Sequence, residues 1–383
     1  MSPDEMERRN IDLAIVANQI VEVVDCSQLG RGWVTEMLDA VLNPKEESKK
    51  PKSKKKQTPL FAVCANICAQ VVADVQRLEQ EDAAEEEKMP AVLKRMSTIA
   101  MFASVKGSLV APHIPVLQSW LADNNMGTSV TKQHIVQAVL ETIDAGLPTM
   151  DKPDKVLLEG IEKSLGVLVV SSGRSLGVLQ HSVKCLCRVV NDGTHNYQLA
   201  EELLKRQYQM LSRSYETGEI EPAQVHRFMA VAGFFCRYYD YDHPDNAEDH
   251  IDQPGLFGDD EAEGGESTLH VGNVSQSVLQ LLWKFYTSDD ANLRHRALTS
   301  MGHVFCRVPK MMTSAPAHKL FTDCLTSKDP RMRAQILKNL GAFLQSEDRA
   351  MTMASKNGAN DANADSGVAS GLVQNFLGHI TAA

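Results

Sequence analysis

The feature that most constrains this chain is a segment that recurs after 39 residues near the C-terminus. Residues 290–302 follow the pattern D-x-x-L-R-x-x-A-L-x-x-M-G, and residues 329–341 follow D-x-x-M-R-x-x-I-L-x-x-L-G. A period of about 40 residues with an aliphatic seam is typical of HEAT-type helical pairs. Such a pair cannot bury its apolar surface alone, so neighbouring pairs stack and share one core. We expect the repeated glycine to lie where two helices approach closely or where a helix bends.

Apolar residues recur at helical spacing along most of the chain, for example Leu176, Leu179, Val183, Leu186 and Val190. Convincing strand alternation is absent. Aromatic residues are only 5% of a chain that is 43% hydrophobic, a balance typical of stacked helices rather than of β-sandwiches. The sequence therefore predicts an all-α fold, a HEAT-repeat α-solenoid of stacked antiparallel helix pairs with roughly a dozen helices.

Polar and charged segments interrupt the predicted helices, and none is long enough to require a domain boundary. They resemble insertions between stacked helices, since few of their residues are apolar. The predicted order is N-terminal helices over 1–43, a lysine-rich loop over 44–57, HEAT-type repeats over 58–242, an acidic disordered loop over 243–268, HEAT repeats over 269–354, a polar loop over 355–367 and the start of a truncated further helix over 368–383.

The charge and the cysteines limit the class of protein. A net charge of −10 excludes nucleic-acid binding through overall basicity, so any DNA-binding face must be a local patch. Eight cysteines without a C-x-x-C pair indicate reduced thiols in a cytosolic or nuclear protein. The charged N-terminus is no secretory signal, and no run approaches the roughly 18 apolar residues of a bilayer span. We expect a soluble intracellular protein without a membrane partner.

Motifs for catalysis are missing from the sequence. It contains no P-loop, no dinucleotide-binding glycine motif, no H-E-x-x-H and no G-x-S-x-G. Cys185 and Cys187, with His181 one turn earlier, suggest a metal site, but zinc requires four ligands at recognisable spacing. Burial in the core explains the two cysteines better. We therefore predict a protein that is not an enzyme, with no catalytic residue, no metal and no cofactor.

Two groups of arginines recur. Arg294 and Arg333 occupy the same repeat position, where we expect each to pair with Asp290 or Asp329 of its own or a neighbouring repeat. A Cys-Arg pair also lies near three predicted helix ends and includes Arg188, Arg237 and Arg307. A cation at a helix C-terminus is favoured by the macrodipole, which accounts for the pattern without any binding role.

The lysine run has two functional interpretations besides that of a solvated loop without a role. It could be a nuclear localisation signal or a flexible arm that contacts phosphate. The residues concerned are Lys49, Lys50, Lys52, Lys54, Lys55 and Lys56.

Three segments resemble the Nipped-B (adherin) family of cohesin loaders. Residues 235–242, FCRYYDYD, are similar to the cysteine-arginine-aromatic-aspartate segment of that family. Residues 335–340, QILKNL, followed by FLQSED at 343–348, are similar to a stretch further along those proteins, and HSVKCL at 181–186 is similar to an earlier helix. The order and approximate spacing agree from Ile114 to the C-terminus, the C-terminal HEAT-repeat region of the family.

The resemblance implies a HEAT scaffold in the nucleus that loads cohesin onto chromatin for sister chromatid cohesion. Its partners would be the kleisin and SMC subunits of cohesin and DNA, and it would stimulate the SMC ATPase without catalysis of its own. A small helical loader partner would bind outside this chain, which we expect to be a fragment. Arg188, Arg237 and Arg307 are then candidates for contacting DNA or an acidic partner along one edge. The alternative is a generic α-solenoid adaptor of the transport-receptor or phosphatase-scaffold type.

Overall fold

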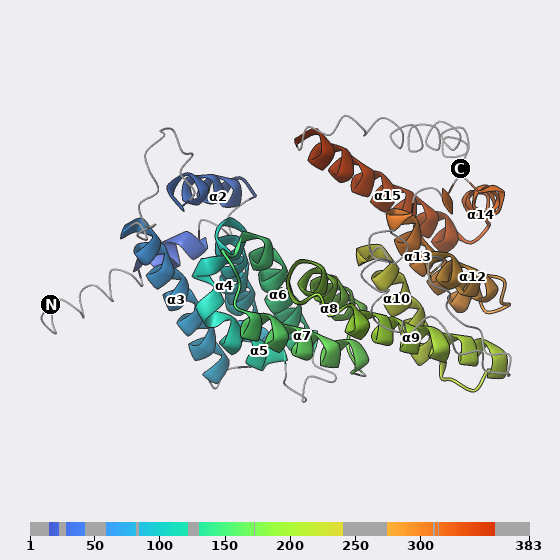
Figure 1. Cartoon of the computed structure of the whole chain (residues 1–383), viewed down its shortest axis with the longest axis horizontal. Helices are drawn as coiled ribbons and strands as arrows, with labels where there is room; N and C mark the ends of the chain where they lie inside the picture. Colours follow the sequence, from blue (N-terminus) through green and yellow to red (C-terminus); the bar gives the residue numbers. More distant parts are fainter. Residues whose placement is uncertain are drawn as a thin grey trace, which may run out of the picture. The chain divides into compact units, whose positions relative to one another are not determined.

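A computed structural model describes residues 15–22, 28–42, 59–81, 84–121, 130–171, 173–239, 274–308, 311–312 and 314–356. The chain divides into two compact units, residues 1–195 (unit 1) and 196–383 (unit 2). Every regular element in these described ranges is helical (Figure 1), which confirms the predicted all-α fold. The predicted lysine-rich loop at 44–57 and acidic loop at 243–268 lie outside the described residues, as does everything after residue 356.

The first described element of unit 1 is a helical segment at residues 15–22. Its further elements are α2 (Gln28–Leu42), α3 (Pro59–Gln80), α4 (Glu85–Val105), η1 (Gly107–Leu109), η2 (Ala111–His113), α5 (Ile114–Leu121), α6 (Val130–Gly146), η4 (Leu147–Thr149), α7 (Lys155–Val170), α8 (Leu176–Val189) and the π-helical turn η5 (Val190–Thr194).

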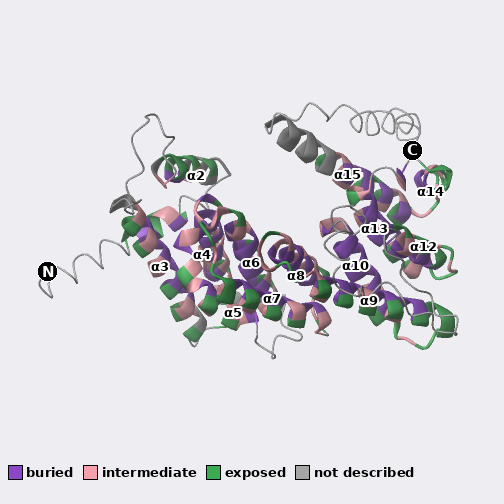
Figure 2. Ribbon diagram, in the orientation of Figure 1, coloured by how far each residue is buried: buried purple, intermediate pink, exposed green. Residues whose placement is uncertain are grey.

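The helices of unit 1 form two layers. Helices α4, α6 and α8 pack side by side, and each also contacts a helix of the other layer: α3 packs on α4, α5 on α6 and α7 on α8 (Figure 1). The buried residues lie along the helix faces that meet (Figure 2). This arrangement is the stacked helix pair of a HEAT-like solenoid, in which each layer covers the apolar face of the other.

A threonine ties together the C-terminal ends of α4 and α6. The hydroxyl of Thr149 donates to the carbonyl oxygen of Ala103 at 2.6 Å and accepts from the backbone N–H of Gly107 at 2.7 Å. A Cβ atom on Gly107 would lie 2.1 Å from the carbonyl oxygen of Gly146, so only glycine allows this approach. The end of α4 is thereby held against the end of α6.

Unit 2 repeats the same two-layer arrangement. Its helices are α9 (Tyr197–Thr217), α10 (Pro222–Tyr238), α12 (Val274–Tyr286), α13 (Ala291–Arg307), α14 (Ala315–Leu325) and α15 (Pro330–Lys356). Helices α10, α13 and α15 stack in that order, while α9, α12 and α14 pack against α10, α13 and α15 respectively (Figure 1). Helix α15 extends two residues into the polar segment predicted at 355–367.

The 39-residue repeat predicted from the sequence sets the register of α13 and α15. The Oδ1 atom of Asp290 accepts from the backbone N–H of Asn292 at 2.7 Å, and Oδ1 of Asp329 accepts from that of Arg331 at 2.9 Å. Each aspartate therefore caps the first turn of its helix. The Arg331 side chain also donates to Oδ1 of Asn292 at 3.4 Å, which links equivalent positions of the two helices.

The repeated glycine marks a close approach in one helix only. A Cβ atom on Gly302 of α13 would lie 2.4 Å from the Asn339 side chain of α15. The same geometry occurs one step earlier in the stack, where Gly233 of α10 faces Ser300 of α13. Gly341, the repeat mate of Gly302, has nothing within 4 Å of such an atom. The expected close approach is confirmed at Gly302 and does not hold among the described residues at Gly341.

The repeated arginine pairs differently from the expectation. Nη1 of Arg294 donates to the carbonyl oxygens of Ser288 and Asp289 at 2.8 and 2.9 Å, and Nη1 of Arg333 donates to that of Ser327 at 2.6 Å. Within the described residues neither arginine forms an ion pair with Asp290 or Asp329. The expectation was wrong because both aspartates already accept from backbone amides at the helix start. Each arginine instead closes the turn that precedes its own helix.

One helix resembles a membrane span by length and composition. Residues Phe61–Leu78 of α3 are long and apolar enough to cross a membrane, although 39% of this segment is buried. Core helices of soluble proteins can have the same length and composition, so the evidence for a membrane span is weak. The segment contains Asp74 and Arg77, which form an ion pair at 3.1 Å. The sequence was expected to contain no apolar run long enough to span a bilayer, and the segment Phe61–Leu78 corrects this expectation.

Candidate functional site

Arg188 lies near the end of α8 and joins that helix to α6. Its Nη1 atom donates to the carbonyl oxygen of Asp144 at 2.7 Å and lies 3.1 Å from Oδ1 of the same residue. Nζ of Lys184 lies 2.7 Å from Oδ2, so one carboxylate, which is nearly buried, receives two cations. The Arg188 side chain remains 32% exposed. Its position fits a helix-end tie between neighbouring repeats and leaves part of the guanidinium at the surface.

Arg237 lies near the end of α10 and reaches α13. Its Nη1 atom donates to Nδ1 of His303 at 3.0 Å, and its guanidinium lies 5.5 Å from the ring centre of Tyr238. Burial, and then the charge of Arg237, lowers the pKa of His303 to about 3. The imidazole is therefore neutral and accepts the bond, while its ring packs edge-on against Phe234.

Arg307 is the last residue of α13 and is exposed. It lies in unit 2 with Arg237, whereas Arg188 lies in unit 1. A shared binding edge for the three arginines therefore stays a prediction. The lysine run Lys49–Lys56, the other candidate group, lies outside the described residues.

The cysteines suggested as metal ligands are core residues. Cys185 and Cys187 are buried, and burial raises the pKa of Cys185 far above its usual range. His181 faces another helix: its Nε2 atom lies 3.3 Å from Oε1 of Glu141, and its Nδ1 atom lies 2.8 Å from the carbonyl oxygen of Gly177. Among the described residues no group of three or more His, Cys, Asp or Glu side chains is placed to hold a metal ion.

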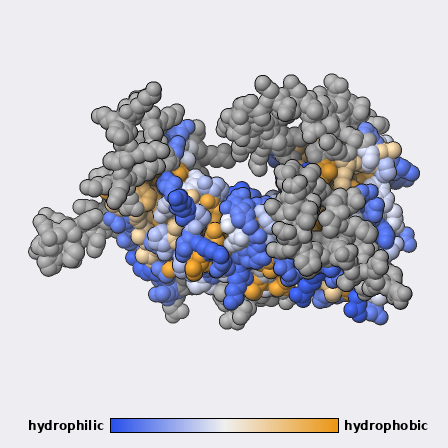
Figure 3. Space-filling view, viewed as in Figure 1, coloured by the Kyte–Doolittle hydropathy of each residue, from blue (hydrophilic) through white to orange (hydrophobic). Residues whose placement is uncertain are grey.

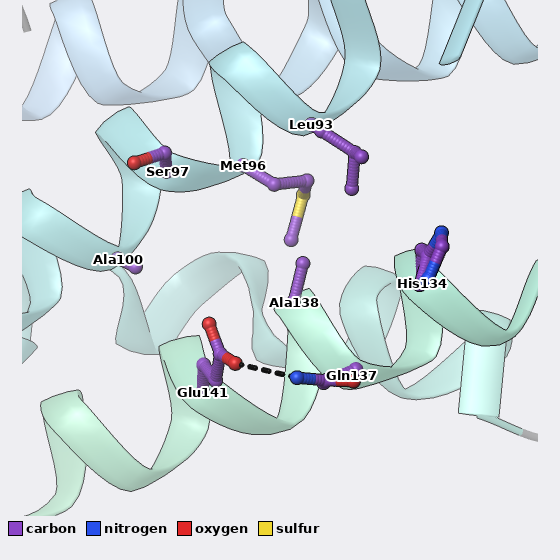
Figure 4. Close-up of a pocket in the computed structure, with 8 residues that line it drawn as sticks. All are labelled: Leu93, Met96, Ser97, Ala100, His134, Gln137, Ala138 and Glu141. Carbon is purple, nitrogen blue, oxygen red and sulfur yellow. Dashed lines mark hydrogen bonds between the residues drawn. The ribbon is translucent and has the colours of Figure 1, made fainter. Parts of the chain in front are cut away.

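A hollow of about 380 Å³ lies between α4 and α6 of unit 1 (Figure 4). Met96 and Ala138 approach each other across it, and Oε1 of Glu141 accepts from Nε2 of Gln137 at 3.1 Å. Its wall is formed by both polar and apolar side chains. Its lining is Leu93, Met96, Ser97, Ala100, His134, Gln137, Ala138 and Glu141.

A second recurrence connects consecutive helices of unit 2. His226 and Arg227 are the fifth and sixth residues of α10, and His295 and Arg296 are the fifth and sixth residues of α13. In both helices a glycine follows the histidine seven positions later, so the two pairs share one register. These residues are not among the positions predicted from the sequence, although the repeated His-Arg-(five residues)-Gly pattern is visible there.

Burial and neighbouring positive charges lower the pKa values of side chains in both pairs. Burial and then Arg206 lower the pKa of Arg227, while burial and then Arg296 lower those of His226 and His295. Arg331 and Lys338 act on His295 in the same direction. The positive side chains that act on these pKa values are Arg206 of α9, Arg296 of α13, and Arg331 and Lys338 of α15.

The described surface visible in Figure 3 is mainly hydrophilic, with small apolar areas between the polar ones. Exposed apolar side chains such as Val156 and Val167 of α7 occur singly or in small groups, as on most soluble proteins.

Comparison with known proteins gives one consistent result. No protein-family model matches the sequence. The zebrafish Nipped-B-like protein B is 24% identical over 368 residues, which is 91% of this chain and 12% of that protein. The human Nipped-B-like protein is 23% identical over 96% of this chain and 13% of its own length, and the fly Nipped-B protein is 22% identical over 95% and 18%.

The chain thus spans between 12% and 18% of the length of these relatives. The similarity reaches well beyond the two-thirds of the chain that carries the motifs at 181–186, 235–242 and 335–348, because it also includes most of the N-terminal third. The stacked helix pairs and these matches together confirm the resemblance predicted from the sequence: over nearly its whole length, this chain is similar to proteins of the Nipped-B family.

Proposed function

We propose that this chain is a non-catalytic scaffold segment of a cohesin loader, which binds cohesin subunits and DNA. The observation that carries the proposal is the similarity to Nipped-B-like proteins over more than nine-tenths of the chain. The fold supports it, because stacked helix pairs present long surfaces suited to binding other macromolecules. In this proposal the ATP hydrolysis belongs to the SMC subunits, and the scaffold stimulates it.

Arg188, Arg237 and Arg307 are the proposed contacts with DNA or an acidic partner. The three differ in how well they can be tested. Arg188 and Arg237 hold neighbouring helices together through Asp144 and His303, so reversing their charge also weakens the fold. Arg307 is exposed at the end of α13, so reversing its charge places no charge in the core.

We also propose that the protein acts in the nucleus, with the run Lys49–Lys56 as its import signal. A cluster of lysines in a polar segment is the kind of sequence that import receptors bind. Replacing the six lysines by glutamine in the fluorescently tagged chain should then abolish nuclear accumulation. Unchanged accumulation would mean that the run has another role.

A binding assay with purified cohesin tests the main proposal. The tagged chain should retain the kleisin and SMC complex, and added chain should raise ATP hydrolysis in the presence of DNA. Arg307→Glu should lower both responses, whereas Lys319→Glu, the same change on an exposed side chain of α14, should leave them unaltered. If the folded chain neither retains cohesin nor changes its ATPase rate, the loader role is wrong and the generic α-solenoid adaptor remains.

A further inference from the structure

The hollow between α4 and α6 lies where small side chains meet in the helix stack of unit 1. Ser97 and Ala100 of α4 and Ala138 of α6 all line it (Figure 4). At the next step of the stack, by contrast, the long side chain of Lys184 crosses from α8 to Asp144 of α6. The hollow measures about 380 Å³, and pockets that bind ligands span about 300–1,000 Å³. It is therefore large enough to receive a side chain from another molecule.

One carboxylate borders the hollow. The Oε1 atom of Glu141 accepts from Nε2 of Gln137 at 3.1 Å and lies 3.3 Å from Nε2 of His181. Both contacts use Oε1, and within the described residues no other side chain donates to this carboxylate. Figure 4 shows the other oxygen, Oε2, directed away from Gln137 and toward α4. The Glu141 side chain is 49% exposed, so a partner can reach it.

The histidine does not supply a cation to Glu141 in its neutral form. Nδ1 of His181 lies 2.8 Å from the carbonyl oxygen of Gly177, and a carbonyl oxygen can only accept, so the proton of the neutral ring is on Nδ1. Nε2 then presents a lone pair toward Glu141. Three residues further along α6, in contrast, Asp144 has Lys184 at 2.7 Å. The carboxylate of Glu141 is thus left to attract a cation from outside.

Helix α8 fixes the position of this carboxylate. Gln137, which donates to Glu141, packs over the start of α8, where a Cβ atom on Gly177 would lie 3.0 Å from Oε1 of Gln137. Next to this contact, the backbone N–H of Ser175 donates to Oε1 of Gln133 at 2.5 Å, which ties α8 to α6. The carboxylate is therefore preorganised, which lowers the entropy cost of binding a cation.

We propose that the hollow between α4 and α6 binds a lysine side chain from a segment of a partner protein. The methylene stem of that lysine lies against Met96 and Ala138, and its ammonium group binds Oε2 of Glu141. Lysine commonly buries its stem along an apolar surface while its charge stays near water. The net charge of −10 favours the approach of a basic segment. The inference does not depend on the cohesin-loading role.

Lysine fits this site better than arginine. The guanidinium group binds a carboxylate most strongly through two parallel hydrogen bonds, which require both oxygens. Oε1 of Glu141 already accepts from Gln137, so one oxygen remains. An ammonium group is a compact charge that a single oxygen can bind. The pair one step along the stack has this form, since Nζ of Lys184 lies 2.7 Å from Oδ2 of Asp144.

Methyl NMR of the full chain tests the proposal through Met96. This side chain points toward Ala138 in the hollow (Figure 4), and Met96→Leu identifies its signal among those of the 16 methionines. The probe is a short glycine- and serine-based peptide with one central lysine. We expect a saturable shift of the Met96 signal with a dissociation constant on the order of millimolar, because one side chain makes the contact.

Two control peptides separate the stem of the lysine from its charge. Norleucine in place of lysine keeps the methylene stem and removes the ammonium group, and it should bind about threefold more weakly or less tightly still. In the second peptide, 2,4-diaminobutyric acid keeps an amino group on a stem that is two methylenes shorter. It should bind about fivefold more weakly or less tightly still, because less apolar surface is buried.

Substitutions in the chain then locate the site. Glu141→Gln should weaken binding of the lysine peptide by about threefold or more and leave that of the norleucine peptide unchanged. Glu159→Gln makes the same charge change on an exposed residue of α7 and should have no effect. Ala138→Leu fills the hollow and should abolish the response with Glu141 intact. Circular dichroism checks that each variant keeps its helicity.

Four results would overturn the proposal. The first is a Met96 signal that the lysine peptide does not shift in a saturable way. Equal affinity for the lysine and norleucine peptides would mean that the carboxylate is not used. Equal losses from Glu141→Gln and Glu159→Gln would mean that only the overall charge matters. If spermidine binds more tightly than the peptide and loses that affinity in Glu141→Gln, the hollow binds a free polyamine instead of a protein segment.

Discussion

The side-chain amide of Asn339 donates to the carbonyl oxygen of Leu298 at 2.8 Å and packs directly over Gly302. Nε2 of Gln335 donates to Oδ1 of the same asparagine at 2.8 Å, so the side chain is fixed from both ends. A buried amide with its partners satisfied specifies one arrangement of two helices. The contact between α13 and α15 is therefore set by a polar side chain that fits against a glycine.

Gly302→Ala should destabilise unit 2, whereas Gly341→Ala should stabilise it. The new methyl group at position 302 would meet Asn339 at 2.4 Å and force a shift that costs about 1–3 kcal/mol. At position 341 the space is open, and alanine in a helix is more favourable than glycine by about 0.5–1 kcal/mol.

Urea unfolding can be followed for unit 2 alone, because Trp283 is its single tryptophan. A Trp33→Phe/Trp120→Phe background leaves that reporter. The two alanine variants should move the midpoint in opposite directions. Shifts of the same sign and size would show that the Gly302–Asn339 contact does not control the packing of α13 on α15.

Arg294→Met and Arg333→Met should each lower the stability of unit 2 by about 1–2 kcal/mol. Each substitution removes charged hydrogen bonds to the carbonyl oxygens of the preceding turn and leaves those oxygens without their donor. Arg331→Met is the matched control, since that side chain is mostly exposed and its bonds are longer. Equal midpoints for the Arg331 and Arg333 variants in the same assay would contradict this role.

The sequence predicted what depends on short-range patterns. The repeat register and the buried seam follow from spacing within one helix pair, and Ala297 and Ile336 are fully buried at equivalent positions. Leu298 and Leu337 show the limit, because the first is buried and the second is 44% exposed. Their environment depends on the next helix in the stack, which a pattern within one repeat does not include.

The candidate sites were harder to predict for a related reason. The partners of Arg188 and Arg237 lie 44 and 66 residues away, on other helices, so helix-end electrostatics gave only part of their role. The His-Arg pairs of α10 and α13 were visible as a pattern. Their relation appeared only once the two helices were placed side by side, where burial and then Arg296 lower the pKa of both histidines.

Glu201 should make unit 2 less stable as the pH rises from about 5 to 8. Burial raises the pKa of this carboxyl to about 7, whereas an unfolded glutamate ionises near about 4.3. Between these values the unfolded state has released its proton and the folded state still holds it. Stability therefore falls through this range and stays low above it.

Glu201→Gln removes that titration and should stabilise unit 2 at pH 8 by up to about 3 kcal/mol, with little gain at pH 5. The neighbouring exposed residue provides a control, because Glu202→Gln should give the same small change at both values. The measurement is the urea midpoint of each variant, followed by Trp283 fluorescence at pH 5 and at pH 8. A pH-independent effect of Glu201→Gln would show that this carboxyl is ionised in the fold.

Asp144→Asn should destabilise unit 1 by about 1–3 kcal/mol, because Lys184 and Arg188 lose the carboxylate that neutralises both. Asp151→Asn is the control: its carboxylate pairs with Lys106 at 2.7 Å but is largely exposed, and such pairs contribute less than about 1 kcal/mol. Trp120 fluorescence in a Trp33→Phe/Trp283→Phe background reports on this unit. If both variants behave alike, the Asp144 cluster does not join α6 to α8. If only Asp144→Asn is destabilised, Arg188→Glu, which breaks the same ion pair, should also destabilise unit 1. A loss of partner binding by the Arg188→Glu variant must then be separated from its loss of stability before a partner contact is assigned to Arg188.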